Sequence, residues 1–219
     1  MTRRAIATAV LAARLVAGLV AGALAAAPAV AQQADSGLGE ADWPCRGGYR
    51  PALAAAAVWT GPELGDARQR WRDDPAVRKL AERLASPETS PDQGVREIDR
   101  FAAALGDDRR RRLILLVAGL IEEINVYRRF AVAGVWEFTA KRRLLADVMA
   151  ETETRYRALP YDGAAASEAE RKRLEEQRFW QSRAYEDFDD EARYLCKRLV
   201  YLEGKLGALA RAIAAHVAR

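Results

Sequence analysis

The sequence predicts an all-α protein built on a long antiparallel helical hairpin, a coiled-coil arm with shorter N-terminal helices packed on its root. Two long stretches, 107–159 and 167–217, carry apolar residues at intervals of three and four, which is the spacing of an amphipathic helix. The connection between them is short and contains Pro160 and Gly163, so the two helices must fold back on each other. No segment shows the alternation of a β-strand. We therefore expect a four-helix root and a projecting two-helix arm.

Residues 1–31 have the layout of a secretory signal peptide. A basic start with two arginines is followed by an apolar run over 15–27, and small residues at Ala29 and Ala31 mark a cleavage site before Gln32. The apolar run is too short for a comfortable membrane span. An uncleaved anchor is the alternative, and the arginine pair leaves open a twin-arginine signal. We expect export to the bacterial periplasm or the medium.

Loss of the signal changes the charge of the protein. Residues 1–31 contain three arginines and no acidic residue, so their removal takes the formal net charge from +4 to +1. A nearly neutral protein gives little support for nucleic-acid binding, which needs a basic face. The polar segment 32–41 is expected to be a disordered leader, and 42–219 to be a single all-α domain. Within that domain, 42–106 should hold a strap and the short helices.

The chain has two cysteines, Cys45 and Cys196, and one histidine, His216. Lipid attachment needs a cysteine directly after the signal, a redox site needs Cys-x-x-Cys, and zinc needs three or four nitrogen or sulfur ligands. In an oxidising compartment the two thiols should instead form a disulfide. Two free buried thiols and an intermolecular bridge are the alternatives. A closed loop of about 150 residues should stabilise the fold by roughly 4–5 kcal/mol.

The short helices have clear start signals. The segment 51–59 can form two turns of helix before Gly61 and Pro62. Asp74 followed by proline predicts an N-cap and the first helical position. Ser90, with Gln93 three residues later, predicts a second helix start with a capping box. This second helix should end near Gly106.

The long helices differ along their length. The first should begin at Asp107 or Asp108, and the second at Ser167, with Glu170 completing a capping box. Residues 113–121 are apolar almost all round and face 195–213, so this root end needs further cover, which the two shorter helices and the disulfide strap should supply. Leu199 and Leu206 lie in the seam of this root, and we expect further helices to cover them. Toward the hairpin tip the sequence is charged and has apolar spacing for one seam, so arm residues such as Leu145 should stay partly exposed to water.

Two groups of residues are candidates for partner contact. Four consecutive cations at a helix N-terminus oppose the helix dipole. They could bind lipid phosphate, an anionic partner, or carboxylates of neighbouring helices. Aromatic residues near the hairpin tip could form a contact surface, or could pack in the seam and anchor the loop. The candidates are Arg109, Arg110, Arg111, Arg112, Tyr161, Phe179 and Trp180.

The sequence offers no catalytic constellation. The single histidine sits in register with the seam, and there is no Gly-rich phosphate loop, nucleophile elbow or repeated Glu-x-x-His motif. An acidic run over 186–191 suggests calcium, but helical geometry spreads its carboxylates around the axis, and basic neighbours at 141–143 favour a solvated ion-paired face. We expect no cofactor, no metal and no enzymatic activity.

The expected function is that of an exported, non-catalytic interaction protein, a scaffold or adaptor. Its partner would be a protein that the sequence does not identify, with peripheral contact to anionic lipid as a further option for the arginines. The alternatives are a periplasmic holdase chaperone, which grips unfolded clients, and an accessory subunit of an envelope enzyme complex. The sequence does not indicate an oligomeric state.

Overall fold

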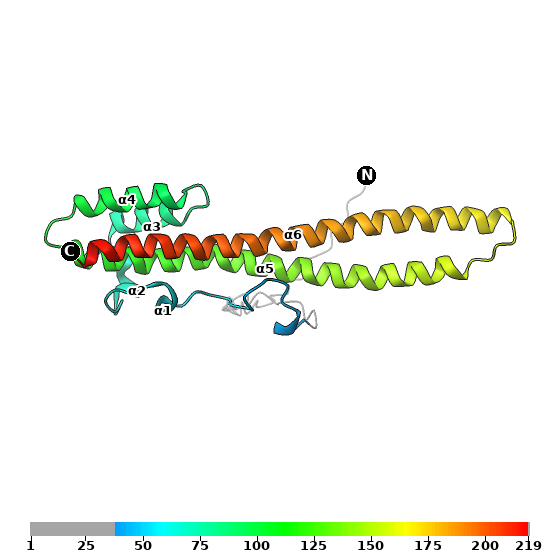
Figure 1. Ribbon diagram of the computed structural model, residues 1–219, viewed down its shortest axis with the longest axis horizontal. Coiled ribbons are helices and arrows are strands. Elements are labelled where there is room, and N and C mark those ends of the chain that lie inside the picture. Colours follow the sequence, from blue (N-terminus) through cyan, green and yellow to red (C-terminus); the bar gives the residue numbers. More distant parts are fainter. Residues whose placement is uncertain (1–37, 219) are drawn as a thin grey trace, which may run out of the picture. The chain divides into compact units, whose positions relative to one another are not determined.

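A computed structural model describes residues 38–218, which form helices, turns and loops and no strand. Helices α5 (Arg109–Ala158) and α6 (Ala165–Val217) lie side by side in opposite directions (Figure 1). This confirms the predicted all-α hairpin. None of the helices in this part of the chain is long and apolar enough to cross a membrane. The predicted signal peptide and its cleavage site at Ala31 and Gln32 lie outside the described residues.

The shorter helices gather at one end of the hairpin and cover it on two sides (Figure 1). On one side, α3 (Pro75–Ala85) packs on α5, and α4 (Pro91–Ala103) packs on α6. On the other side lie α1 (Ala55–Val58) and α2 (Ala67–Arg70), the latter continued by the 3-10 helix η2 (Trp71–Asp73). The predicted four-helix root therefore consists of α3 to α6, with two additional single turns of helix beneath it.

The start signals of α3 and α4 act as predicted, with one difference. Asp74 Oδ1 accepts hydrogen bonds from the backbone N–H groups of Ala76 and Val77, at 3.0 and 3.1 Å. Ser90 Oγ accepts from the N–H of Gln93 at 3.2 Å. The side chain of Gln93 does not return this bond, because it donates to a Glu97 carboxylate one turn later. The capping box is therefore only half formed.

Two helix boundaries differ from those predicted. The segment 51–59 forms a single turn, α1, and not two turns. Helix α6 begins at Ala165 and not at Ser167. The reason is Asp162, whose carboxylate accepts from the Ala164 N–H at 3.0 Å and from the Ser167 hydroxyl at 3.5 Å. Asp162 thus satisfies the start of the helix from outside it, after Gly163 has turned the chain with a φ of 69°.

The root is organised around Trp71, which is fully buried. Its indole lies against Gly119 of α5, where a β-carbon would come within 2.6 Å of the ring. Glycine at this position therefore lets the indole approach the helix backbone. Around Trp71 one continuous core joins apolar side chains of α3, α4, α5 and α6, among them Leu84, Ile98, Leu116, Leu206 and Ile213.

A second, smaller core lies further along the hairpin. It contains Ala131, Val132 and Val135 of α5 and Leu199 of α6. Of the two kinds of cover expected for this end of the hairpin, short helices and the disulfide strap, it is the strap that lies over Leu199. The strap is an irregular segment before α1 and comprises residues 43–50. It begins after the short 3-10 helix η1 (Glu40–Asp42), which includes the last residues of the predicted leader.

The arm is a two-helix structure with a better closed seam than the sequence suggests. Leu174 of α6 is fully buried. The expectation that seam residues of the arm stay partly exposed to water is therefore wrong at this position. Next to it lies a buried polar layer. Thr152 Oγ1 donates to the backbone carbonyl of Val148 and accepts from the side-chain amides of Gln177 and Gln181, at 3.3 and 3.0 Å.

The contact between Trp71 and Gly119 predicts the effect of adding one methyl group. Gly119→Ala should lower the free energy of unfolding by about 1–3 kcal/mol, because the buried indole has no room to move away. Gly204→Ala is the matched control, since nothing lies within 4 Å of its added β-carbon. That variant should be neutral or more stable by about 0.5–1 kcal/mol. Urea unfolding followed by circular dichroism measures both, and equal stabilities would contradict this account of the root.

Candidate functional site

The disulfide expected between Cys45 and Cys196 is present and joins the strap to α6. The two α-carbons are 5.3 Å apart, and the bond closes a loop of 151 residues. Both cysteines are partly buried against the second core. The bond therefore holds an extended segment, which has no helical partner of its own, onto the middle of the hairpin.

Three aromatic residues continue the strap contact. Trp43 and Tyr49 of the strap pack against each other and against Trp136 of α5, with ring centroids 5.1 to 5.6 Å apart. Offset and edge-on aromatic pairs of this kind add to the burial energy of their rings. This cluster was not predicted, although Trp43 and Tyr49 lie close to Cys45 in the sequence.

Buried polar side chains of α5 satisfy the backbone of the segment that follows the strap. Asn125 accepts from the N–H of Leu53 at 2.9 Å and donates to its carbonyl at 3.1 Å. Arg128 donates to the carbonyls of Arg50 and Leu199, at 2.8 and 3.4 Å. Burial lowers the pKa of Arg128 from its usual value, but a guanidinium remains charged. These two polar residues within the apolar face of α5 were the available sequence signal for this contact.

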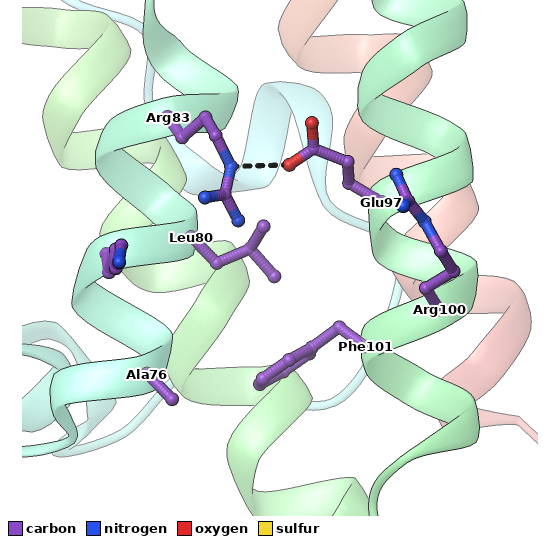
Figure 2. A pocket seen from close by; sticks show the side chains of 7 residues that line it. Ala76, Leu80, Arg83, Glu97, Arg100 and Phe101 are labelled. Atoms are coloured by element: carbon purple, nitrogen blue, oxygen red, sulfur yellow. Dashed lines mark hydrogen bonds and ion pairs between the residues drawn. The ribbon is translucent and has the colours of Figure 1, made fainter.

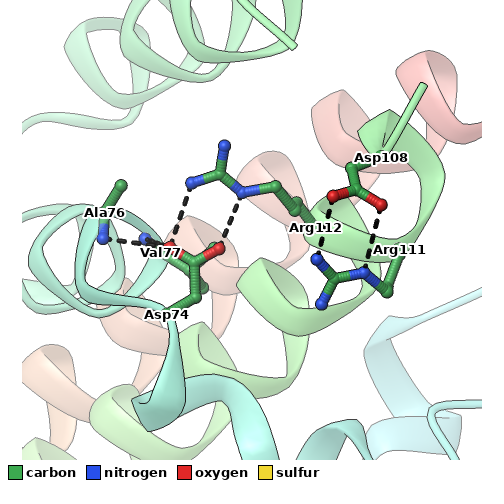
Figure 3. A network of polar contacts seen from close by, with 6 residues as sticks. All are labelled: Asp74, Ala76, Val77, Asp108, Arg111 and Arg112. Carbon is green, nitrogen blue, oxygen red and sulfur yellow. Dashed lines mark hydrogen bonds and ion pairs between the residues drawn. The ribbon is translucent and has the colours of Figure 1, made fainter. Parts of the chain in front are cut away.

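The arginine run at the start of α5 is largely occupied by partners within the chain (Figure 3). Arg112 forms a two-bond pair with Asp74, at 2.7 and 3.0 Å, and thereby ties α5 to the N-cap of α3. Arg111 pairs with Asp108 at 3.1 and 3.4 Å. The pKa of Asp74 lies below its usual value, chiefly because Arg112 donates to it. Of the three interpretations of the run, pairing with nearby carboxylates is the one seen at these two positions.

Arg109 contacts His216, the one histidine in the sequence. Its guanidinium lies 3.0 Å from His216 Nδ1, and His216 Nε2 lies 2.6 Å from an Asp99 carboxylate oxygen. A neutral imidazole protonated on Nε2 satisfies both contacts, because it accepts from Arg109 and donates to Asp99. The contact joins the last turn of α6 to α4 and to the start of α5. Within residues 38–218, Arg110 is the member of the run that has no polar partner.

The aromatic candidates on the arm have different environments. Phe179 and Trp180 are 59% and 62% exposed and form an edge-on pair with centroids 5.1 Å apart. Neither side chain lies in the helix seam. Tyr161 is 87% exposed at the hairpin tip, where the Arg171 guanidinium lies 3.9 Å from its ring. Arg171 also donates to the carbonyls of Leu159 and Pro160. Tyr161 therefore belongs to a tip held by Arg171, whereas the Phe179–Trp180 pair is an exposed apolar feature of the arm.

The acidic run over 186–191 is partly neutralised by basic neighbours. Arg142 of α5 pairs with Asp189 across the seam. Arg193 approaches Asp189 at 2.9 Å and Asp190 at 2.6 Å. In the described part of the chain, no three His, Cys, Asp or Glu side chains come together as a metal ion would require. Arg142 interrupts the apolar stripe of α5, and its ion pair with Asp189 explains how a charged side chain is accommodated there.

Other exposed apolar side chains were not singled out from the sequence. They lie on both long helices, and they are Phe130, Leu144, Val148, Tyr194, Val200 and Tyr201. Tyr194 and Tyr201 are seven residues apart on α6 and therefore share a helix face.

Comparison of the chain with protein-family models, with curated proteins and with solved structures finds no match.

The disulfide predicts a loss of stability on its removal. The Cys45→Ala/Cys196→Ala double variant should lose about 2–5 kcal/mol of the free energy of unfolding, since the unfolded chain gains freedom when the loop is open. Hydrogen exchange should quicken first at the amides of the strap and last in the root segment 202–213. The reduced wild-type protein is the control and should behave like the double variant. An unchanged unfolding curve for both would contradict the role of the disulfide.

Lys205 predicts a dependence of stability on pH. Its ammonium group is buried and donates to the carbonyl of Ser86 at 2.6 Å. Burial, with a smaller contribution from the charge of Arg198, lowers the pKa of Lys205 from 10.5 to about 8. Between these two values the unfolded chain binds more protons than the folded protein, so the free energy of unfolding rises with pH.

The measurement compares wild type with Lys205→Met, which lacks the titrating amine. From pH 7.5 to 9.5 the wild type should gain roughly 1–2 kcal/mol relative to the variant. Other titrating groups are common to both proteins and cancel in the difference. Parallel pH profiles, measured by urea unfolding, would mean that Lys205 is as solvated in the folded protein as in the unfolded chain.

Proposed function

We propose that the protein is an exported, non-catalytic adaptor that docks a partner protein through the Phe179–Trp180 pair of its arm. The observation that carries the proposal is that two large aromatic side chains pack edge-on against each other and remain more than half exposed. Exposed aromatic residues of this size are typical of binding hot spots, where burial against a partner recovers their apolar surface. The signal-like N-terminus and the disulfide support export.

The surroundings of the pair favour a specific docking site. Ion pairs flank it along the arm, with Arg178 at 3.0 Å from Glu153 and Arg183 at 3.5 Å from Glu186. A small apolar centre with a charged rim is the usual anatomy of a protein interface. The two-helix arm also extends beyond the shorter helices of the root (Figure 1), so a partner can reach the pair without contacting the root.

A holdase chaperone is the second candidate. The further exposed apolar side chains on both long helices favour it, because a client-binding surface needs many weak apolar contacts along its length. Under this alternative the Phe179–Trp180 pair would be one contact among several. Docking of an accessory subunit to an enzyme complex is a form of the adaptor proposal and would use the same pair.

Site-specific photocrosslinking in intact cells distinguishes the two candidates. A photoreactive phenylalanine analogue at Trp180 should give one discrete crosslinked species if the protein is an adaptor. The matched position is Val200, which is similarly exposed at 66% but lies away from the pair. It should give no such species. A broad distribution of products from both positions would favour the holdase, and no product from position 180 would contradict the adaptor.

A substitution tests the same point in another way. Once crosslinking has identified the partner, Trp180→Ser should abolish its co-purification with the protein. The melting temperature should stay within about 2 °C of that of the wild type, because surface substitutions change stability little. A loss of partner that accompanied unfolding would not count as loss of a docking residue. Tyr161→Ser is therefore included as a control at an aromatic residue that is even more exposed, and it should retain the partner.

A further inference from the structure

A groove of about 600 Å³ lies between α3 and α4 on the root, far along the chain from the arm residues (Figure 2). Leu80 and Phe101 point toward each other across it, one from each helix. Leu80 is buried beneath the groove, and Phe101 is half-buried. The guanidinium of Arg112 lies 5.3 Å from the Phe101 ring. The floor of the groove is thus apolar, and it is open to solvent between the two helices.

The single carboxylate that lines this groove is already satisfied. Glu97 accepts from Arg83 Nε at 2.6 Å and from the Gln93 amide at 3.2 Å. Burial raises the pKa of Glu97, but these hydrogen bonds outweigh burial and leave its pKa below the usual value. Glu97 is therefore ionised at neutral pH, and its negative charge is paired with the positive charge of Arg83.

Two lining cations are left without an acidic partner. Lys79 of α3 and Arg100 of α4 are exposed, and neither forms a direct ion pair with any residue between 38 and 218. The charge of Arg100 acts on Glu97 from a distance and is a minor cause of its low pKa. Arg100 donates to the backbone carbonyl of Arg96 through Nε, which leaves its terminal nitrogens for another acceptor. The groove thus combines an apolar floor with net positive walls.

We propose that this groove docks an acidic amphipathic helix of a partner protein. One apolar side chain of that helix would lie on Leu80 and Phe101, and carboxylates one turn away would pair with Lys79 and Arg100. This is the helix-in-groove mode, in which apolar anchors supply burial and flanking charges supply orientation. A small ligand is less suited, because small-molecule sites enclose most of the ligand surface, and this groove is open along one side. The site is separate from the Phe179–Trp180 pair, so either can fail without the other.

The test uses a fluorescein-labelled helical peptide of Leu, Ala and Glu, with leucines on one face and glutamates flanking them. The full-length protein should raise its fluorescence anisotropy, and an increase in salt from about 50 to 300 mM should weaken binding, because exposed charges are screened. The same peptide with every Glu replaced by Lys is the control for charge and should bind at least about tenfold more weakly.

Two double variants test whether the peptide binds in the groove. Lys79→Glu/Arg100→Glu should weaken binding of the acidic peptide by about tenfold or more, since both unpaired charges of the groove walls are reversed. Arg110→Glu/Lys197→Glu makes the same change in net charge at exposed positions outside the groove and should leave binding within about twofold. All four substituted residues are exposed, and thermal melts should show that both double variants stay folded.

Several results would overturn the proposal. They are the absence of acidic-peptide binding up to about 1 mM, equal binding of the lysine peptide, and equal weakening by both double variants. Binding of dodecanoate at the groove without binding of the peptide would instead assign it to a small amphiphile. Protein self-association that is lost in Lys79→Glu/Arg100→Glu would assign the groove to a second copy of the chain.

Discussion

A pair of long helices can bury only one stripe of each helix against the other, and this constraint organises the whole protein. Residues 113–121 of α5 are apolar on nearly every face, so the hairpin cannot close this segment alone. Helix α3 packs on α5 from one side, and α2 and η2 pack on it from the other, while α4 and α1 pack on the neighbouring α6 (Figure 1). Where that apolar excess ends, the covering helices end as well, and α5 and α6 continue as a two-helix arm.

Between root and arm the cover changes from helices to an extended strap. An extended segment makes few hydrogen bonds of its own, so its backbone needs partners from elsewhere. Arg128 provides one at Arg50, the last residue of the strap, and Asn125 provides two at Leu53 just after it, while the disulfide holds the strap at Cys196. The aromatic cluster of Trp43, Tyr49 and Trp136 then completes the second core. Covalent, polar and apolar contacts thus act together on a segment that none of them would hold alone.

The same constraint accounts for where binding surfaces are available. In the root, most apolar side chains are used internally, and the arginines at the start of α5 are used to connect helices. What remains open to solvent is the groove between α3 and α4, where Phe101 is half-buried above the buried Leu80. On the arm only two helices are present, so any large apolar residue outside the seam, such as Trp180, faces solvent. An adaptor with one surface on the root and another on the arm would hold two partners at opposite ends of a stiff hairpin.

The sequence by itself determined the helical class, the hairpin, the cysteine pairing and the start of α3 at Asp74, because each depends on local spacing, on capping chemistry or on there being only two cysteines. The start of α6 was missed by two residues, because Asp162, which lies outside the helix, binds the N–H of the N-cap Ala164 and the hydroxyl of Ser167. Only the tertiary structure decided that the strap covers Leu199, that Arg112 pairs with Asp74, and that Phe179 and Trp180 lie outside the seam. Those outcomes depend on which faces of distant segments meet, and periodicity within one helix does not contain that information.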